Sequence, residues 1–246
     1  MADYSTIAKE ARKKVLQMIY EAQTSHIGSN YSAIDIMAVL FSRADMEKDE
    51  VILSAGWKAA AWYYFLWKKG VITEDELNSF CQEGSPFIGL VEPMNRWGLR
   101  FAGGSMGYGL PFGVGVALAK KLKGEEGKVY VLMSDGELQC GTTWESVLIA
   151  NKNKLRNLVV IVDDNGFQAM GETKEILPVY FPKIPQKNVN GHDYYEIEKA
   201  LDDNEAIIIA HTTKGKGVSF MENNNLYHYK QLSQEEYDKA YTELNN

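Results

Sequence analysis

Two short apolar runs, each followed by an acidic turn, constrain the fold of this chain more than any other feature. Residues 129–133 and 158–162 are the two runs, and each leads directly into a turn that carries Asp135 or Asn165. Short runs of apolar, largely β-branched residues bounded by turn residues are typical of buried strands. Asp135 and Asn165 are 30 positions apart, which suits a single crossover helix between parallel neighbouring strands. The pattern therefore predicts an α/β fold with a mainly parallel sheet.

The two turns are predicted to lie at the same edge of the sheet, where the strands end. In open α/β sheets, this carboxyl edge is where ligands bind. The Asp135 carboxylate and the Asn165 amide oxygen, with no His or Cys beside them, suit a hard cation such as Mg²⁺ or Ca²⁺. Gly136 and Gly166 allow a bulky anion to approach the backbone. These residues predict a divalent cation that holds a phosphorylated cofactor.

The same residues also have simpler explanations. Asp135 is suited to the N-cap of a helix, and Asn165 is suited to a left-handed turn. Plain turn geometry accounts equally for Gly104, Gly107 and Gly109. The positions of these residues in the folded chain decide between the explanations.

Length, composition and charge limit the classes of protein to which the chain can belong. With 246 residues, 45% of them hydrophobic, and no Pro/Gly/Ser-rich linker, the sequence predicts one domain over residues 1–246 with a polar tail from about residue 222. No apolar segment is long enough to cross a bilayer and no secretory signal is visible, so we expect a cytoplasmic protein without membrane contacts. The net charge of −7 disfavours binding to nucleic acids. Cys81 and Cys140 lack metal-ligand spacing, so we expect neither a zinc site nor a disulfide framework.

Local patterns predict helices and strands around the two turns. Ser32 with Asp35 forms the pattern of a capping box at the start of a helix, and Thr73 with Glu76 forms another. The helix that follows the turn 104–109 contains several glycines, so we expect a neighbouring helix or a partner subunit to approach it closely. Further predicted elements are an opening helix that includes residues 7–19, a helix over 57–69, and strands over 49–54 and 206–210.

Several motifs together resemble the thiamine diphosphate signature of transketolases. Residues 135–139 and the Asp-Asn-Gly motif at 164–166 match the core of that signature. The other matching segments occur in family order at residues 26–29, 52–56, 104–110, 191–193 and 214–220. The resemblance extends over nearly the whole chain. It implies a three-layer αβα, thiamin diphosphate-binding fold, which is the diphosphate-binding domain of that family.

The resemblance also implies roles for individual residues. Asp135, Asn165 and the backbone carbonyl of Phe167 match the ligands of a Mg²⁺ ion, for which Ca²⁺ or Mn²⁺ can substitute. His26 and His228 match catalytic histidines near the substrate, although each also suits an ordinary hydrogen-bonding histidine or, for His228, an exposed tail residue. The residues matched to thiamine diphosphate binding are Ser54, Trp57, Gly104, Ser105, Met106, Gly136, Glu137 and Asn165.

A second polypeptide is implied by what transketolases need beyond this domain. In that family, a glutamate on a separate pyrimidine-binding domain hydrogen-bonds the cofactor, and this chain matches about the first two-fifths of the family length. We therefore expect an N-terminal subunit that acts with a separate C-terminal subunit in an α2β2 heterotetramer, the C-terminal subunit supplying the pyrimidine-binding domain and the catalytic glutamate. The implied reaction transfers a two-carbon ketol or acyl unit from a small ketose or 2-oxo acid donor to an aldehyde or ketone acceptor.

Several positions depart from the transketolase pattern. Trp57 and Leu90 stand where the family has histidines. The loss of these hydrogen-bond donors weakens the case for a sugar-phosphate donor and favours a less hydroxylated donor, such as a 2-oxo acid, or an unusual sugar acceptor. The alternative for Trp57 is that it packs in the core with its aromatic neighbours. The other changes are Ser134 for a glycine, Cys140 for a glutamate thought to link paired active sites, and Tyr227 and Tyr229 on either side of His228.

Three other functions are alternatives to the two-subunit transketolase. A thiamine diphosphate-dependent 2-oxo acid decarboxylase or carboligase differs from it by the donor. A non-catalytic regulatory or scaffold subunit is suggested by Trp57, Leu90 and Cys140, but it has no need of both metal ligands. A different α/β nucleotide binder is disfavoured, because the chain has no P-loop motif and no Rossmann glycine run after a first strand.

Overall fold

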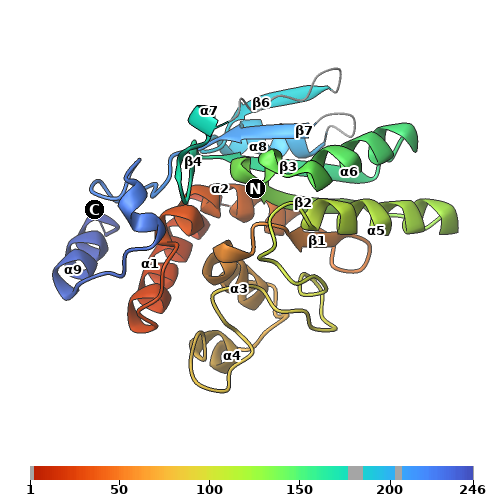
Figure 1. Cartoon of the computed structure of the whole chain (residues 1–246). Helices are drawn as coiled ribbons and strands as arrows, with labels where there is room; N and C mark the ends of the chain where they lie inside the picture. The colour runs from red at the N-terminus through yellow and green to blue at the C-terminus, as the bar shows by residue number, and fades with distance from the viewer. Residues whose placement is uncertain (1–2, 177–184, 203–206, 246) are drawn as a thin grey trace.

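A parallel sheet forms the centre of the computed structural model, which describes residues 3–176, 185–202 and 207–245. Within these residues, the sheet has five strands in the order β1-β2-β3-β7-β6, and every neighbouring pair is parallel (Figure 1). The strands are β1 Glu50–Leu53, β2 Val129–Ser134, β3 Leu158–Asp164, β6 Gln186–Asn190 and β7 Ile207–His211. The predicted parallel sheet is confirmed, although residue 206 of the predicted last strand lies outside the described residues.

Helices cover both faces of the sheet and make a three-layer αβα fold (Figure 1). On one face, α1 Tyr4–Glu21, α2 Ile27–Arg43, α3 Ala59–Lys68 and α8 Tyr194–Leu201 share a large hydrophobic cluster with the sheet. On the other face, α5 Gly109–Lys123 and α6 Gly141–Lys152 enclose a smaller cluster. The α/β fold class predicted from the sequence is therefore confirmed.

The chain passes from β2 to its neighbour β3 through helix α6, as the spacing of the two acidic turns predicts. Ser134, the last residue of β2, is paired in register with Asp163 near the end of β3. Parallel strands that end in register present the residues that follow them at one edge. The turns with Asp135 and Asn165 consequently lie side by side.

One predicted helix start is wrong and another is confirmed. Helix α2 begins at Ile27, so Ser32 and Asp35 are buried in its interior and make no capping box. Asp35 instead accepts two hydrogen bonds from Arg12, at 2.7 and 3.0 Å. Burial raises the pKa of the Asp35 carboxyl, but the hydrogen bond from His192 and the charge of Arg12 outweigh it and lower the pKa to about 2. The capping box of Thr73 with its glutamate is present at the start of α4 Glu74–Asn78.

The glycines of α5 are explained by the sheet. A Cβ atom on Gly113 would overlap the side chain of Val131 in β2, and one on Gly109 would overlap Ser54 after β1. The expected close approach of a neighbouring helix or partner subunit to this helix is therefore wrong for Gly113 and Gly109, which need to be small because strands lie directly beneath them. Around Gly115, on the outer side, there is nothing within 4 Å of the Cβ position.

Short elements complete the edge where the strands end. They are η1 Gly56–Lys58 after β1, η2 Asp135–Gln139 after β2, the hairpin of β4 Phe167–Gln168 and β5 Gly171–Glu172 after β3, and α7 Thr173–Ile176. The polar C-terminal part folds into η3 Asn225–His228 and α9 Gln234–Glu243, which packs on α1 through the stacked rings of Tyr20 and Tyr237. No helix in the described part of the chain is long and apolar enough to cross a membrane.

Candidate active site

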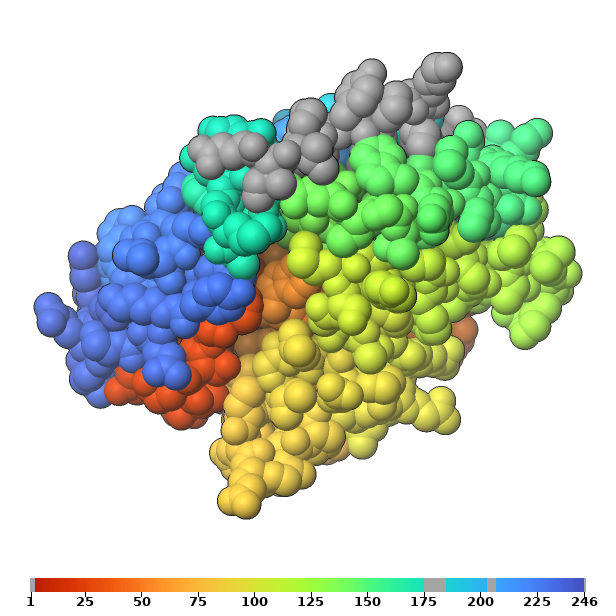
Figure 2. All heavy atoms as spheres, in the orientation of Figure 1, coloured from red at the N-terminus to blue at the C-terminus, as the bar shows by residue number. Residues whose placement is uncertain are grey.

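The candidate site lies at the carboxyl edge of the sheet. Figure 2 shows a hollow there, bordered by the yellow-green loop that precedes α5, the teal β4–β5 hairpin and the blue C-terminal part of the chain. Segments that are far apart in the sequence meet at this edge, because the five parallel strands end there and α2 begins there. The predicted site residues come from these segments.

Asp135 connects the two acidic turns directly. It is fully buried at the start of η2. Its Oδ2 atom accepts hydrogen bonds from the backbone N–H of Gly166, at 2.9 Å, and from the hydroxyl of Thr173, at 3.1 Å. Its Oδ1 atom accepts from Ser134 Oγ and the Gly136 N–H, both at 2.9 Å. The N-cap of this helix is Ser134, so the N-cap explanation for Asp135 is wrong.

The electrostatics around Asp135 fit a bound cation. Burial raises the pKa of the Asp135 carboxyl, and the nearby charges of Asp163 and Asp164 raise it further, to about 7. Keeping the Asp135 carboxylate ionised without a counter-ion costs free energy. A divalent cation bound to the carboxylate would remove that cost. The oxygen-only chemistry of the neighbouring groups is the kind that Mg²⁺ prefers.

Asn165 and Phe167 lie beside Asp135 at the end of β3. Asn165 is buried, donates from Nδ2 to Asp163 Oδ2 at 3.2 Å, and accepts the Phe167 N–H at its Oδ1 atom, also at 3.2 Å. An amide oxygen has two lone pairs, so one remains for a cation. Positive φ in this turn occurs at Gly166 and not at Asn165, so the left-handed explanation for Asn165 is wrong.

Hydrogen bonds to the Glu137 carboxylate join three segments of the site. The carboxylate is fully buried and accepts hydrogen bonds from Ser54 Oγ, from the Gly107 N–H at 3.0 Å and from the Ser134 N–H at 2.8 Å. The Ser54 hydroxyl oxygen in turn accepts the Gly109 N–H at 3.1 Å. Burial raises the pKa of Glu137. These bonds fasten the loop with Gly104, Ser105 and Met106 to the tips of β1 and β2.

The loop before α5 covers the first acidic turn. A Cβ atom on Gly136 would lie 3.2 Å from Met106 Cε and 3.4 Å from Gln168 Cβ, so the glycine backbone is cradled between these side chains. The Gln168 Nε2 atom is buried and has no hydrogen-bond partner among the residues that the structure describes. A buried donor beside a glycine cradle fits an anionic group such as a diphosphate.

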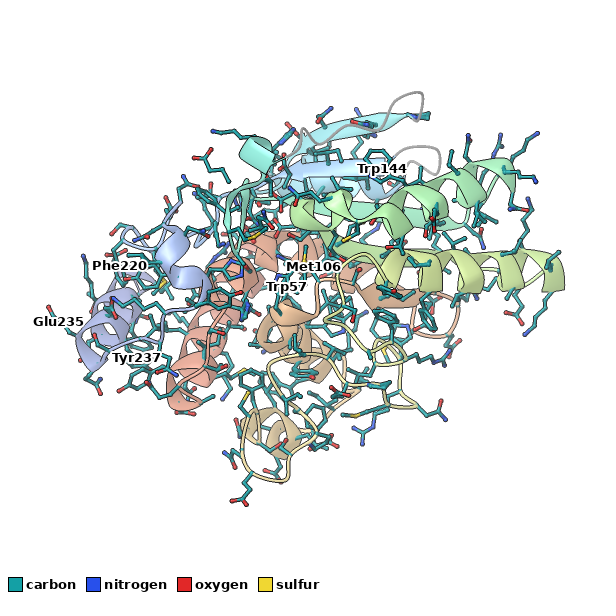
Figure 3. All side chains as sticks on the ribbon, viewed as in Figure 1. Trp57, Met106, Trp144, Phe220, Glu235 and Tyr237 are labelled. Atoms are coloured by element: carbon teal, nitrogen blue, oxygen red, sulfur yellow. The ribbon has the colours of Figure 1, made fainter. Side chains whose placement is uncertain are left out.

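Of the two apolar replacements, Leu90 borders the loop before α5 and Trp57 packs against the core. The Leu90 side chain lies over Gly104, with its Cδ1 atom 3.2 Å from the Cβ position of the glycine, and it is 40% exposed. Trp57 is half-buried and packs against the large hydrophobic cluster. Figure 3 places Trp57 and Met106 in the same central region of the molecule. The alternative explanation for Trp57, packing in the core with its aromatic neighbours, therefore agrees with the structure.

Two buried lysines, which the motifs did not single out individually, give the site positive charge. Lys214 is fully buried, and its ammonium group donates to Asn225 Oδ1 at 2.8 Å and to His228 Nδ1 at 2.9 Å. Burial and the charge of Lys58 lower the pKa of Lys214 to about 8. Lys58 forms a fully buried ion pair with Asp163, at 2.6 Å. Lys214 begins one of the segments that resemble transketolases, whereas nothing local marks Lys58, because lysines are normally exposed.

The two predicted histidines lie together. The ring centroids of His26 and His228 are 5.0 Å apart, and the backbone N–H of His26 donates to the backbone carbonyl of His228 at 3.0 Å. Burial and the charge of Lys214 lower the pKa of His26 to about 4 and that of His228 to about 3. Because His228 Nδ1 accepts from an ammonium group, the ring proton is on Nε2. Both rings are neutral at pH 7 and can exchange hydrogen bonds with a substrate.

The sequence profile described as transketolase, thiamine diphosphate binding domain, matches residues 4–245. The chain belongs to this transketolase family. The family assignment confirms the resemblance seen in the sequence and the thiamine diphosphate-binding character of the domain. Among the described residues there is no cluster of three or more His, Cys, Asp or Glu suited to a metal. The predicted metal site is of another kind, because it combines one carboxylate with an amide oxygen and a backbone carbonyl.

Members of the family resemble this chain over most of its length. The chain is 29% identical to one of the subunits of apulose-4-phosphate transketolase from Phocaeicola vulgatus, over 96% of this chain and 92% of that protein. It is 33% identical to the protein of the same name from Actinobacillus succinogenes, over 96% of this chain and 94% of that protein. Human transketolase is 32% identical over 92% of this chain, but the match spans 39% of that protein. The structure of transketolase from Campylobacter jejuni superposes with a TM-score of 0.90 and 26% identity, over 100% of this chain and 43% of that chain.

Proposed function

We propose that this chain is the thiamine diphosphate-binding subunit of a two-subunit, transketolase-like transferase. The observation that carries the proposal is the junction of the two acidic turns, in which Asp135 binds the Gly166 N–H and Asn165 lies alongside. Relatives that are named as single subunits of a transketolase match this chain nearly from end to end, which supports the two-subunit arrangement.

Within the proposed site, each group has a defined task. Asp135, Asn165 and the carbonyl of Phe167 would hold Mg²⁺, or Ca²⁺ or Mn²⁺ in its place. Gly136 would allow close approach of the diphosphate, and Lys214 would contribute positive charge beside it. When bound, thiamine diphosphate supplies the carbanion chemistry that makes and breaks C–C bonds.

The remaining predicted residues would orient the cofactor and the substrate. Gly104, Ser105 and Met106 would lie along the cofactor, while Ser54 and Glu137 hold their loop in place through the bonds described above. His26 and His228 would donate and accept hydrogen bonds at substrate oxygens, because both rings are neutral. These donors would stabilise charge that develops on oxygen during the reaction.

The border of the site would bind the partner subunit. Six of the exposed apolar side chains lie on the segments that surround the hollow, namely Leu90, Met106, Tyr108, Met170, Leu226 and Tyr229, while others such as Leu122, Leu148 and Tyr195 lie elsewhere on the surface. Exposed apolar residues gathered around a polar site are typical of a surface that another protein covers. The proposed occupant is a C-terminal subunit that supplies the pyrimidine-binding domain and the catalytic glutamate, in an α2β2 assembly.

The donor would be a ketose or a 2-oxo acid, and the acceptor an aldehyde or ketone. Leu90 lies over Gly104, so an apolar side chain would face the donor where a hydroxyl-rich sugar would need hydrogen bonds. A 2-oxo acid decarboxylase or carboligase is therefore the second candidate. A scaffold without chemistry has no use for the buried polar groups around Asp135, which are costly to maintain.

The proposal is tested with the complex of this chain and its partner subunit. Calorimetric titration of thiamine diphosphate with and without Mg²⁺ should show metal-dependent binding that Asp135→Ala abolishes. Glu145→Gln, which changes an exposed carboxylate on α6, is the matched control and should bind as the natural protein does. Unchanged affinity in Asp135→Ala would refute the metal assignment, and turnover by this chain alone would refute the two-subunit arrangement.

A further inference from the structure

Asp163 accepts four hydrogen bonds at the strand ends, as many as Asp135, and none of the family motifs points to its role. It is fully buried near the end of β3. Its Oδ2 atom accepts from Ser32 Oγ at 2.6 Å and from Lys58 Nζ at 2.6 Å, and its Oδ1 atom accepts from Thr212 Oγ1. A carboxylate bound by so many donors from separate elements has a single orientation.

Lys58 is the counter-ion of this carboxylate. Both side chains are inaccessible to solvent, and the ammonium group also donates to the Ser29 carbonyl at 3.1 Å. A buried carboxylate without a counter-ion would be very unfavourable. Lys58 therefore allows Asp163 to remain an acceptor in the interior.

The remaining donor to Asp163 is the amide nitrogen of Asn165, at 3.2 Å. A primary amide can present either its oxygen or its nitrogen to a neighbour, and the two ends have opposite hydrogen-bonding character. Since Asp163 can only accept, it binds the nitrogen. The oxygen of Asn165 is then directed to the other side, where it accepts the Phe167 N–H and keeps one lone pair.

We propose that Asp163, held by Lys58, is a positioning residue that orients the Asn165 amide so that its oxygen and not its nitrogen faces the metal. Groups that orient metal ligands in this way typically change metal affinity by 10- to 100-fold when they are removed. The inference rests on the proposed function, because it concerns the metal site named there. Lys58 follows Trp57 directly, so the segment that lost a histidine contributes to the site through this ion pair.

Two double variants test the proposal without changing the net charge of the site. Lys58→Met with Asp163→Val removes the ion pair and the acceptor for Asn165. Lys58→Met with Asp163→Asn removes the same charges but keeps an acceptor oxygen, and it is the matched control. Both are measured as complexes with the partner subunit, by calorimetric titration of thiamine diphosphate with Mg²⁺ and with EDTA, after circular dichroism has established that they are folded.

The valine variant should bind the cofactor at least about tenfold more weakly than the asparagine variant in Mg²⁺, and equally in EDTA. Equal affinity of the two variants in Mg²⁺ would overturn the orienting role. If the valine variant does not fold, Asp163→Ala with Lys58→Met replaces it, with the same expected result. Absence of any Mg²⁺ dependence in the natural complex would instead overturn the proposed function, so the two failures are distinguishable.

Discussion

Replacement of Lys58 by methionine alone is expected to destabilise the protein strongly. The variant leaves the Asp163 carboxylate fully buried without its counter-ion, while the length of the side chain at position 58 is almost unchanged. The perturbation therefore removes the ammonium group, with its charge and its hydrogen bonds to Asp163 and the Ser29 carbonyl, and keeps the packing of the alkyl chain. Its effect should appear in the free energy of unfolding even when no cofactor is present.

The magnitude follows from the geometry of the ion pair. At 2.6 Å and an effective dielectric constant of about 20, the attraction between the two charges is about 6 kcal/mol. Part of this attraction offsets the cost of desolvating the ammonium group, a cost that methionine does not have. Three hydrogen-bond donors to Asp163 remain in the variant. We therefore expect the free energy of unfolding to fall by about 3–5 kcal/mol, the range found when one partner of a buried pair is removed.

Urea-induced unfolding followed by circular dichroism measures this loss. Lys48→Met is the matched control, because Lys48 pairs with Glu126 at 3.1 Å on the surface, where the two side chains are 56% and 81% exposed. The control should lose less than about 1 kcal/mol. The further change Asp163→Val in the Lys58→Met background should recover part of the lost stability. Equal losses for Lys58→Met and Lys48→Met would refute the reasoning about the buried pair.

Three further predictions concern other parts of the chain. The pKa of Asp35 is lowered to about 2, so the stabilising contribution of its carboxylate is present above pH 4 and is lost as the pH falls from about 4 to about 2. In urea unfolding at several pH values, Asp35→Asn should remove roughly 2 kcal/mol of this pH dependence of the free energy of unfolding, and an unchanged pH dependence would contradict this. Gly109→Ala should lower the free energy of unfolding by about 1–3 kcal/mol, because its Cβ atom would overlap Ser54, whereas Gly115→Ala on the open side of α5 should raise it by about 0.5–1 kcal/mol. Thermal unfolding that ranks the two variants in the opposite order would count against the packing described. Leu90→His should raise turnover of ketose phosphates relative to 2-oxo acids in the two-subunit enzyme, because it adds a hydrogen-bond donor beside Gly104; a constant ratio would show that this position does not select the donor.

The central part of the site could be predicted from sequence because it depends on local patterns. Two apolar runs, followed by acidic turns whose Asp135 and Asn165 are 30 positions apart, determine a pair of parallel strands, and the ends of parallel strands share one edge. The proximity of Asp135 and Asn165 follows from this geometry alone. The capping box at Thr73 was predictable for the same reason, since its partners are three residues apart.

The same kind of reasoning failed at Ser32 and Asp35, because tertiary partners outweighed the local pattern. Ser32 donates to Asp163, 131 positions away, and Asp35 binds Arg12 on another helix. Both side chains match a capping box in the sequence, but burial inside α2 gives each a partner that no short window contains.

The sequence by itself determined the αβα fold, the edge at which the site lies and the residue types that we propose bind a metal and a diphosphate there. Only the tertiary structure decided which charged groups are buried beneath that edge, in particular the pair of Lys58 and Asp163 and the support from Glu137. The physical reason is that strand and turn preferences act over a few residues. Whether a buried charge is tolerated depends on a counter-ion and on hydrogen-bond donors that distant segments bring together only when the chain folds.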